Sequence, residues 1–221
     1  MKKFLPFEAF KKSYNKLKDE EKHEVFYYSL FDISDIAQYE ETEIKNERKR
    51  IEKEIMENVP KVFKSGKFKK ESREDFIRRN VYTDRLCKYI IAVELEKKGI
   101  RLRIPKSSEK FDLLLNNGIV IEIKRIVGGT AFGDYIIKDI EEKYKNNENR
   151  LLLILIFPQF GEENFERVSR LIEIYYITEK YLSERLKGKT KVVCQYITKK
   201  QTEEYSLWRL IERLEENIKS F

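Results

Sequence analysis

The sequence predicts an α/β fold with a central mixed sheet of about five strands flanked by helices. Two apolar runs in the segment 110–124, separated by Asn116, Asn117 and Gly118, predict a β-hairpin. The segment 150–158 is continuously apolar, as expected of a strand buried on both faces. With 221 residues, 41% of them hydrophobic, the chain can hold one such domain and a helical extension.

The N-terminal part, residues 1–80, has apolar residues at helical spacing and no strand alternation. We therefore expect a helical region packed on a core formed by residues 81–221. Within the N-terminal part, lysines alternate with phenylalanines over 61–70, which indicates either a phosphate-binding loop or a solvated linker. The only histidine, His23, lies in a polar run and is expected on a helix surface.

The core is expected to begin with a helix at 81–99 that is apolar on two sides, so it should lie between the sheet and the N-terminal helices. A first strand follows at 100–104. Beyond the hairpin, the pattern predicts a right-handed parallel crossover between strands. The remaining elements are expected as a helix at about 132–145, a strand at 150–158, a helix at 162–186, a strand at 189–197 and a closing helix at 203–219. The closing helix is expected to form a dimer surface or to cover the edge of the sheet.

The loop length of the hairpin decides which charged side chains share a face. If the loop is Asn116, Asn117 and Gly118, with Gly118 left-handed, then Asp112 lies opposite Glu122. One face of the hairpin is then apolar, and the other carries Asp112, Leu114, Val120, Glu122 and Lys124. A two-residue turn at Asn117 and Gly118 would place Asp112 on the opposite face.

Two carboxylates directly opposite each other on paired strands are about 5 Å apart and repel. A divalent cation between Asp112 and Glu122 would remove this conflict, and hard oxygen ligands suit Mg²⁺. A lysine at position 124 could orient or deprotonate a water molecule beside the metal. The alternative is an ordinary solvated strand face in a chain that is 38% charged. The combined pattern favours the catalytic interpretation.

The segment GIRLRIPKSSEKFDLLLNNGIVIEIKR, residues 99–125, resembles the PD-(D/E)xK nuclease superfamily and is most similar to archaeal Holliday junction resolvases. The resemblance implies a restriction-endonuclease-like core and Mg²⁺-dependent hydrolysis of DNA, with Mn²⁺ able to substitute. It implies that Asp112, Glu122 and the Ile123 carbonyl hold the metal while Lys124 positions the attacking water. The chain departs from the family at Phe111, where proline is common, and at Arg125, where resolvases usually carry serine.

Related nucleases often add an acid from the first helix of the core. Asp84 is the first candidate for this role and Glu94 the second. The resemblance also implies a serine-bearing loop near the scissile phosphate. Residues that border the site are expected to contact the DNA backbone: Arg101, Arg103, Lys106, Ser107, Ser108, Lys110 and Arg125.

The charge balance, 46 Lys and Arg against 39 Asp and Glu, suits a nucleic-acid partner. We expect DNA as that partner and a homodimer, because symmetric cutting of two strands needs two sites. Three alternatives stay open. The protein could be a resolvase specific for branched DNA, a restriction or repair-type nuclease, or a nucleic-acid-binding protein without catalysis.

Cysteine-based metal sites, small-molecule cofactors and a membrane or secreted location are not expected. Cys87 and Cys194 are isolated in apolar stretches, so we expect core residues and neither a zinc nor an iron–sulfur site. No small-molecule cofactor is expected. No apolar run reaches the length of a membrane span, and the first residues lack a secretory core, so a cytoplasmic protein without membrane contact is expected.

Overall fold

The structure is a computed structural model that describes residues 7–30, 85–105, 109, 111–126, 134–159, 165–186 and 189–221, with side chains for all of these except 134–136 and 165–172. In chain order the elements are α1 (Phe7–Tyr14), α2 (Asp19–Ser29), α6 (Arg85–Lys97), β1 (Leu102–Arg103), β2 (Leu113–Leu115), β3 (Val120–Arg125), α7 (Asp134–Tyr144), β4 (Leu151–Pro158), α8 (Phe165–Arg185), β5 (Thr190–Ile197) and α9 (Leu207–Lys219). The expected α/β fold is confirmed. The basic segment 61–70 lies outside the described residues.

The five strands form one mixed sheet in the order β1-β2-β3-β4-β5. The first three strands pair antiparallel, whereas β3, β4 and β5 pair parallel. All eight residues of β4 are buried, because this strand has a parallel neighbour on each side and helices on both faces. The parallel connection through α7 was predicted by the strand, helix and strand pattern. A second parallel connection, through α8, joins β4 to β5.

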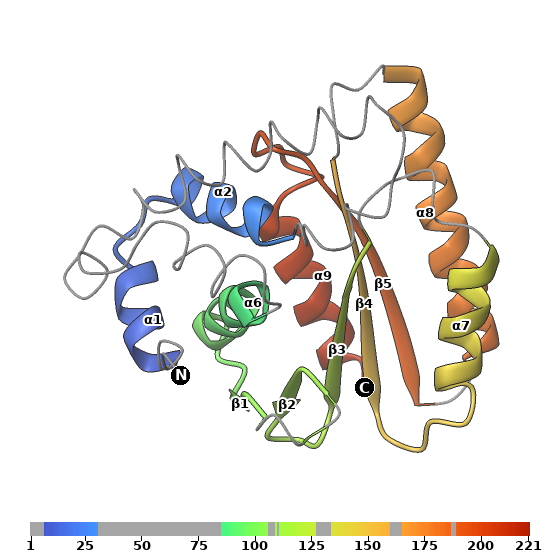
Figure 1. The fold of residues 1–221 in the computed structure, drawn as a ribbon. Helices are drawn as coiled ribbons and strands as arrows, with labels where there is room; N and C mark the ends of the chain where they lie inside the picture. The colour runs from blue at the N-terminus through green and yellow to red at the C-terminus, as the bar shows by residue number, and fades with distance from the viewer. Residues whose placement is uncertain are drawn as a thin grey trace, which may run out of the picture.

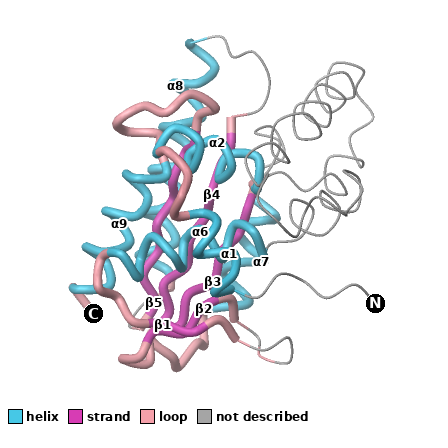
Figure 2. Tube along the Cα trace, turned by 90° about the vertical axis from the view of Figure 1, so that its left-hand side faces the viewer, coloured by secondary structure: helices cyan, strands magenta, loops and turns pink. Residues whose placement is uncertain are grey.

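Helices cover both faces of the sheet (Figure 1). On one face, α6 and α9 share a core with the N-terminal helices and with Ile121 and Ile123 of β3. Figure 2 shows α1, α2 and α6 in front of the strands. On the other face, side chains from α7 and α8 pack on β4 and β5. The result is a three-layer arrangement.

Helix α6 lies between the sheet and the N-terminal helices, as its two apolar sides predicted. It contacts α1, α2 and α9, and Leu86, Ile90, Ile91 and Leu95 are each 2% exposed or less. Cys87 is buried on this helix and Cys194 on β5, so both cysteines are core residues as expected.

The prediction that His23 lies on a helix surface is wrong, since its side chain is 1% exposed. Its Nε2 lies 2.9 Å from the Thr198 carbonyl oxygen, and its Nδ1 accepts a hydrogen bond from the Leu207 backbone at 3.3 Å. Because a carbonyl only accepts and an N–H only donates, the ring is neutral with its proton on Nε2. His23 therefore joins α2 to the end of β5 and the start of α9.

Helix α9 covers the sheet. Leu207, Leu210, Ile211 and Leu214 are buried in the core shared with α6. Two roles were expected for this helix, a dimer surface or a cover for the edge of the sheet. Its apolar face packs on the sheet, where α9 contacts the edge strand β5. Among the helices described, none is both long and apolar enough to cross a membrane.

Candidate active site

The hairpin has the register that the three-residue loop predicted. Leu113 pairs with Ile121 and Leu114 with Val120, and the Leu115 N–H donates to the Ile119 carbonyl at 2.9 Å. Gly118 has φ +83°, the left-handed conformation that glycine adopts without penalty. The regular pairing ends at Leu113: the Asp112 N–H donates to the Ile121 carbonyl at 3.0 Å, so Asp112 lies just before β2, close to Glu122 but not paired with it in the ladder.

The two faces of the hairpin differ as expected. Leu113, Leu115, Ile119, Ile121 and Ile123 all belong to the core shared with α6 and α9. Glu122 and Lys124 alternate with these residues and therefore point to the face covered by α7. Glu122 and Lys124 thus lie on one side of β3, while Ile121 and Ile123 lie on the apolar side together with Arg125 at the end of the strand.

Asp112 is held at the edge of β3 by two contacts. Its Oδ2 accepts a 2.6 Å hydrogen bond from the Ile123 N–H, and its Oδ1 lies 2.6 Å from the Lys88 ammonium of α6. Burial raises the pKa of this carboxyl above its ordinary value, and the nearby Glu122 charge adds to the increase, although Lys88 opposes both. Asp112 is consequently a carboxylate whose charge depends on a cation beside it.

Glu122 is only 7% exposed and has two lysines at one of its oxygens. Its Oε1 lies 2.7 Å from the ammonium of Lys124 and 3.7 Å from that of Lys143, at the end of α7. Burial alone would lower the pKa of Lys124, but the bond to Glu122 and the charges of both carboxylates raise it overall. Lys124 is therefore protonated at neutral pH while it contacts Glu122.

Tyr144, the last residue of α7, brings a phenol to the same place. Its hydroxyl oxygen is buried and makes no well-formed hydrogen bond with any residue that the structure describes. Burial, followed by the charge of Glu122, raises the pKa of this phenol, so the hydroxyl keeps its proton. The Lys143 ammonium lies 5.1 Å from the centre of the Tyr144 ring. The hydroxyl is thus a neutral donor beside a buried carboxylate.

The oxygen atoms at this site fit Mg²⁺, which takes one or two protein carboxylates and keeps several waters. Because the Asp112 N–H donates to the Ile121 carbonyl, the Ile123 carbonyl, two residues on, also faces the edge where Asp112 lies. Asp112, Glu122 and the Ile123 carbonyl would hold the ion. Among the described residues, no group of three or more His, Cys, Asp or Glu side chains that could hold a metal ion is found, at this site or elsewhere.

The predicted acid from the first core helix is not identified by the structure. Asp84 lies outside the described residues. Glu94 is 5% exposed, but its carboxylate lies 2.7 Å from Lys97 and close to Tyr14, on the side of α6 that faces α1. The structure therefore does not bring Glu94 to the site, and Lys88 is the α6 residue that reaches Asp112.

The residues predicted to contact the DNA backbone fall into two groups: those that the structure describes and those that lie outside the described residues. The exposed Arg103 pairs with Glu109 through bonds of 2.8 and 2.6 Å, and Arg125 donates to the Ser29 carbonyl at 3.1 Å. Arg101 is exposed before β1. The other predicted contacts lie outside the described residues: Lys106, Ser107, Ser108 and Lys110. For all seven residues the DNA-binding role stays a prediction.

Three residues of the site were not predicted from the sequence: Lys88, Lys143 and Tyr144. Lys88 did leave a signal, because it interrupts the apolar run of α6 between Cys87 and Tyr89. Lys143 and Tyr144 left none in their own segment. They reach Glu122 because α7 connects two parallel strands and so runs back toward the start of β3.

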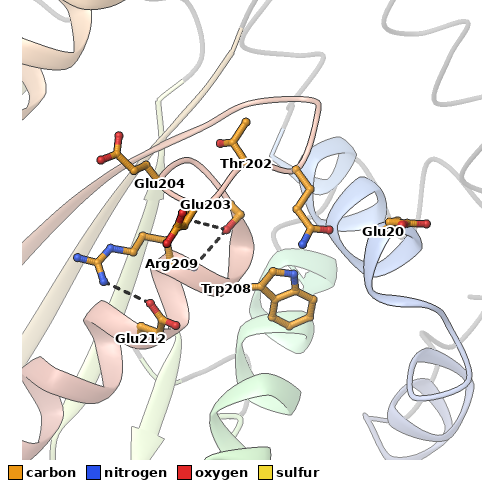
Figure 3. A pocket seen from close by; sticks show the side chains of 9 residues that line it. Glu20, Thr202, Glu203, Glu204, Trp208, Arg209 and Glu212 are labelled. Atoms are coloured by element: carbon orange, nitrogen blue, oxygen red, sulfur yellow. Dashed lines mark hydrogen bonds and ion pairs between the residues drawn. The ribbon is translucent and has the colours of Figure 1, made fainter.

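A surface pocket of about 930 Å³ lies elsewhere, between α2 and the start of α9. Figure 3 shows Trp208 and Arg209 in this pocket, with Glu20 contributed by α2. The other acidic residues that line it are Glu203, Glu204 and Glu212. An acidic lining repels phosphate, so this pocket is not suited to nucleic acid.

No family model matches the chain, and neither curated proteins nor solved structures give a significant match. Function is therefore argued from the geometry of the residues around Asp112 and Glu122.

Proposed function

We propose that the protein is a metal-dependent nuclease that hydrolyses phosphodiester bonds of DNA. The observation that carries the proposal is that two carboxylates meet at β3, since Asp112 accepts from the Ile123 N–H and the buried Glu122 is the preceding residue, paired with Lys124. A fold that only needed a stable strand would gain more from apolar residues there, since burying charged groups costs free energy even when they are paired. The proposed core is of the restriction-endonuclease type.

In this proposal the residues have distinct roles. Asp112, Glu122 and the Ile123 carbonyl hold Mg²⁺ or Mn²⁺, which when bound polarises the phosphate and lowers the pKa of a bound water. Lys124 orients the attacking water and offsets negative charge that develops on the phosphate oxygens. Lys143, whose side chain is 53% exposed, would contact phosphate from the α7 side.

DNA and a second copy of the chain are the proposed partners. The basic residues that border the hairpin would position the DNA backbone without reading its sequence. Branched DNA is the first substrate to test, because the segment 99–125 is most similar to junction-resolving nucleases.

A second candidate is a nucleic-acid-binding protein without catalysis. One observation favours it: Lys88, Lys124 and Lys143 already neutralise both carboxylates, so no metal is needed for charge balance. Metal-dependent cleavage separates the two candidates.

The test uses linear duplex, single-stranded, flap and four-way junction DNA, each incubated with Mg²⁺, Mn²⁺ or EDTA. The proposal predicts cleavage with either metal and none with EDTA. DNA binding without cleavage under all conditions would instead support the non-catalytic candidate.

Matched glutamine variants test the residues. Glu122→Gln is expected to reduce cleavage by more than about a hundredfold, since losing even an outer partner of a metal ligand costs 10–100-fold. Glu94→Gln is the control. Glu94 is about as buried as Glu122 and also pairs with a lysine, but it lies away from the site, on the side of α6 that faces α1. Equal loss in both variants would indicate a structural effect and contradict the assignment of Glu122.

A further inference from the structure

All of the large hydrophobic side chains that are exposed in the described part of the chain belong to one helix, α8. The exposed fractions are 44% for Ile174, 56% for Tyr176, 67% for Ile177 and 37% for Tyr181. The opposite side of the helix is buried on the sheet through Tyr175 and Leu182. Exposed apolar groups that gather on one element mark an interaction surface, whereas scattered ones need no explanation.

Helical geometry gives this surface two different sides. With 3.6 residues per turn, Ile177 lies at its centre, almost opposite the buried face. Glu173 and Lys180 lie to one side of Ile177, with Tyr176 beyond them. Ile174 and Tyr181 lie to the other side, where the Tyr181 hydroxyl donates to Glu141 of α7. The surface therefore has a charged side and an apolar side that run parallel to the helix axis.

We propose that α8 binds α8 of a second copy of this chain, antiparallel, around a two-fold axis at Ile177. Such an axis brings the charged side of one helix against the charged side of the other, and likewise the two apolar sides. Glu173 lies four residues before Ile177 and Lys180 three residues after it. In the pair, Glu173 and the partner's Lys180 therefore lie at nearly the same height along the helix axis, with an offset of one residue rise, about 1.5 Å.

Self-complementarity is the reason for choosing a second copy as the occupant. The axis makes two equivalent Glu173–Lys180 pairs, packs Ile174 against the partner's Tyr181 and places the two Ile177 side chains in contact. A parallel pair, whose two-fold axis runs along the helices, would instead place the charged side of one helix against the apolar side of the other. This inference does not rest on the nuclease proposal, since none of these residues belongs to the site at Asp112 and Glu122.

A contact made by one helix from each protomer lies at the small end of protein interfaces, so the dimer should dissociate on dilution. Sedimentation velocity over a wide concentration range measures this directly. Wild-type protein is expected to change from monomer to dimer as its concentration rises. Ile177→Glu places two carboxylates at the axis and should weaken the dimer about tenfold or more.

A charge exchange tests the register. Glu173→Lys and Lys180→Glu should each weaken the dimer about tenfold, and the double variant Glu173→Lys/Lys180→Glu should restore it. Glu216→Lys, which inverts an exposed charge on α9, is the control and should leave the dimer unchanged. Circular dichroism melting would verify that each variant is folded.

Three results would overturn the proposal. A wild-type protein that stays monomeric throughout excludes the surface as a dimer contact. A dimer unaffected by Ile177→Glu places the contact elsewhere. Failure of the double variant to recover, when both single variants weaken the dimer, contradicts the antiparallel register. Nuclease assays on the same proteins report separately on the site.

Discussion

Asp112, which is partly buried, and Glu122, which is buried, are two carboxylates held by lysines that come from three different elements. Lys88 arrives from α6, Lys124 from the same strand as Glu122, and Lys143 from the end of α7. Breaking such a pair leaves an uncompensated buried charge, which is more costly than the net gain from forming it. The arrangement therefore tolerates the loss of a lysine only if another cation takes its place.

Tyr144 gives the sharpest prediction for a single residue. Tyr144→Phe removes the hydroxyl beside Glu122 but keeps the ring. Because this hydroxyl is buried without a well-formed hydrogen bond in the described part of the chain, the variant is expected to be as stable as wild type, or more stable by about 1 kcal/mol. If the hydroxyl helps to orient Glu122 for metal binding, Mn²⁺ affinity and cleavage should each fall about tenfold.

The measurements are titration with Mn²⁺ by calorimetry, urea unfolding and cleavage rates. Tyr14→Phe is the matched control, since the Tyr14 hydroxyl is equally buried and likewise unpaired among the described residues, but lies near Glu94. Unchanged Mn²⁺ affinity in Tyr144→Phe would limit Tyr144 to packing. A similar decrease in both variants would indicate a general effect on the fold.

At the level of elements, the hairpin could be predicted because two independent signals fixed it. Side-chain alternation assigned each residue to a face, and Gly118 marked the position that requires positive φ. A register shift by one residue would have moved Ile121 and Ile123 out of the core. The count did not fix Asp112 itself, because the pairing stops at Leu113 and the Asp112 N–H bonds the Ile121 carbonyl.

Other contacts could not be predicted, because they depend on how distant elements pack. The sequence around His23 is polar, yet α2 lies between α6 and the segment that joins β5 to α9, so even polar residues of α2 are buried. The contacts of Lys88, Lys143 and Tyr144 likewise depend on how distant elements pack. Each of these residues belongs to an ordinary helix pattern and gains its role only from the strand that its helix packs against.

The junction at His23 predicts a pH dependence of stability. Burial lowers the pKa of His23 in the folded protein, whereas the unfolded chain takes up a proton near the ordinary value of 6.5. The unfolded state therefore binds more protons below that pH, and the free energy of unfolding should decrease as pH falls from 7.5 to 5.5. Urea unfolding at several pH values measures this.

His23→Gln is the matching variant, because glutamine keeps a donor and an acceptor but does not titrate. His23 is the only histidine, so the difference between the two proteins isolates its contribution. The decrease in stability toward pH 5.5 should be smaller in the variant. Parallel pH profiles for both proteins would show that His23 does not control stability in this range.

At the level of the whole molecule, the candidate site joins two layers of the fold. Asp112 is tied to α6 on one side of the sheet, and Glu122 contacts the end of α7 on the other. A ligand that binds both carboxylates would therefore connect both helical layers through the central strand. Its binding free energy would add to the stability of the folded state as a whole.

This coupling predicts that divalent metal stabilises the protein against heat. A ligand at a hundred times its dissociation constant adds about 2.7 kcal/mol, which corresponds to a rise in Tm of about 5–10 °C for a chain of this size. Differential scanning calorimetry with Mg²⁺, Mn²⁺ or EDTA measures the change. The rise should persist in Glu94→Gln and disappear in Glu122→Gln, because only the latter loses a proposed ligand. An equal rise in both variants would place the metal outside the candidate site, and no rise in wild type would favour the lysine pairs as a purely structural network.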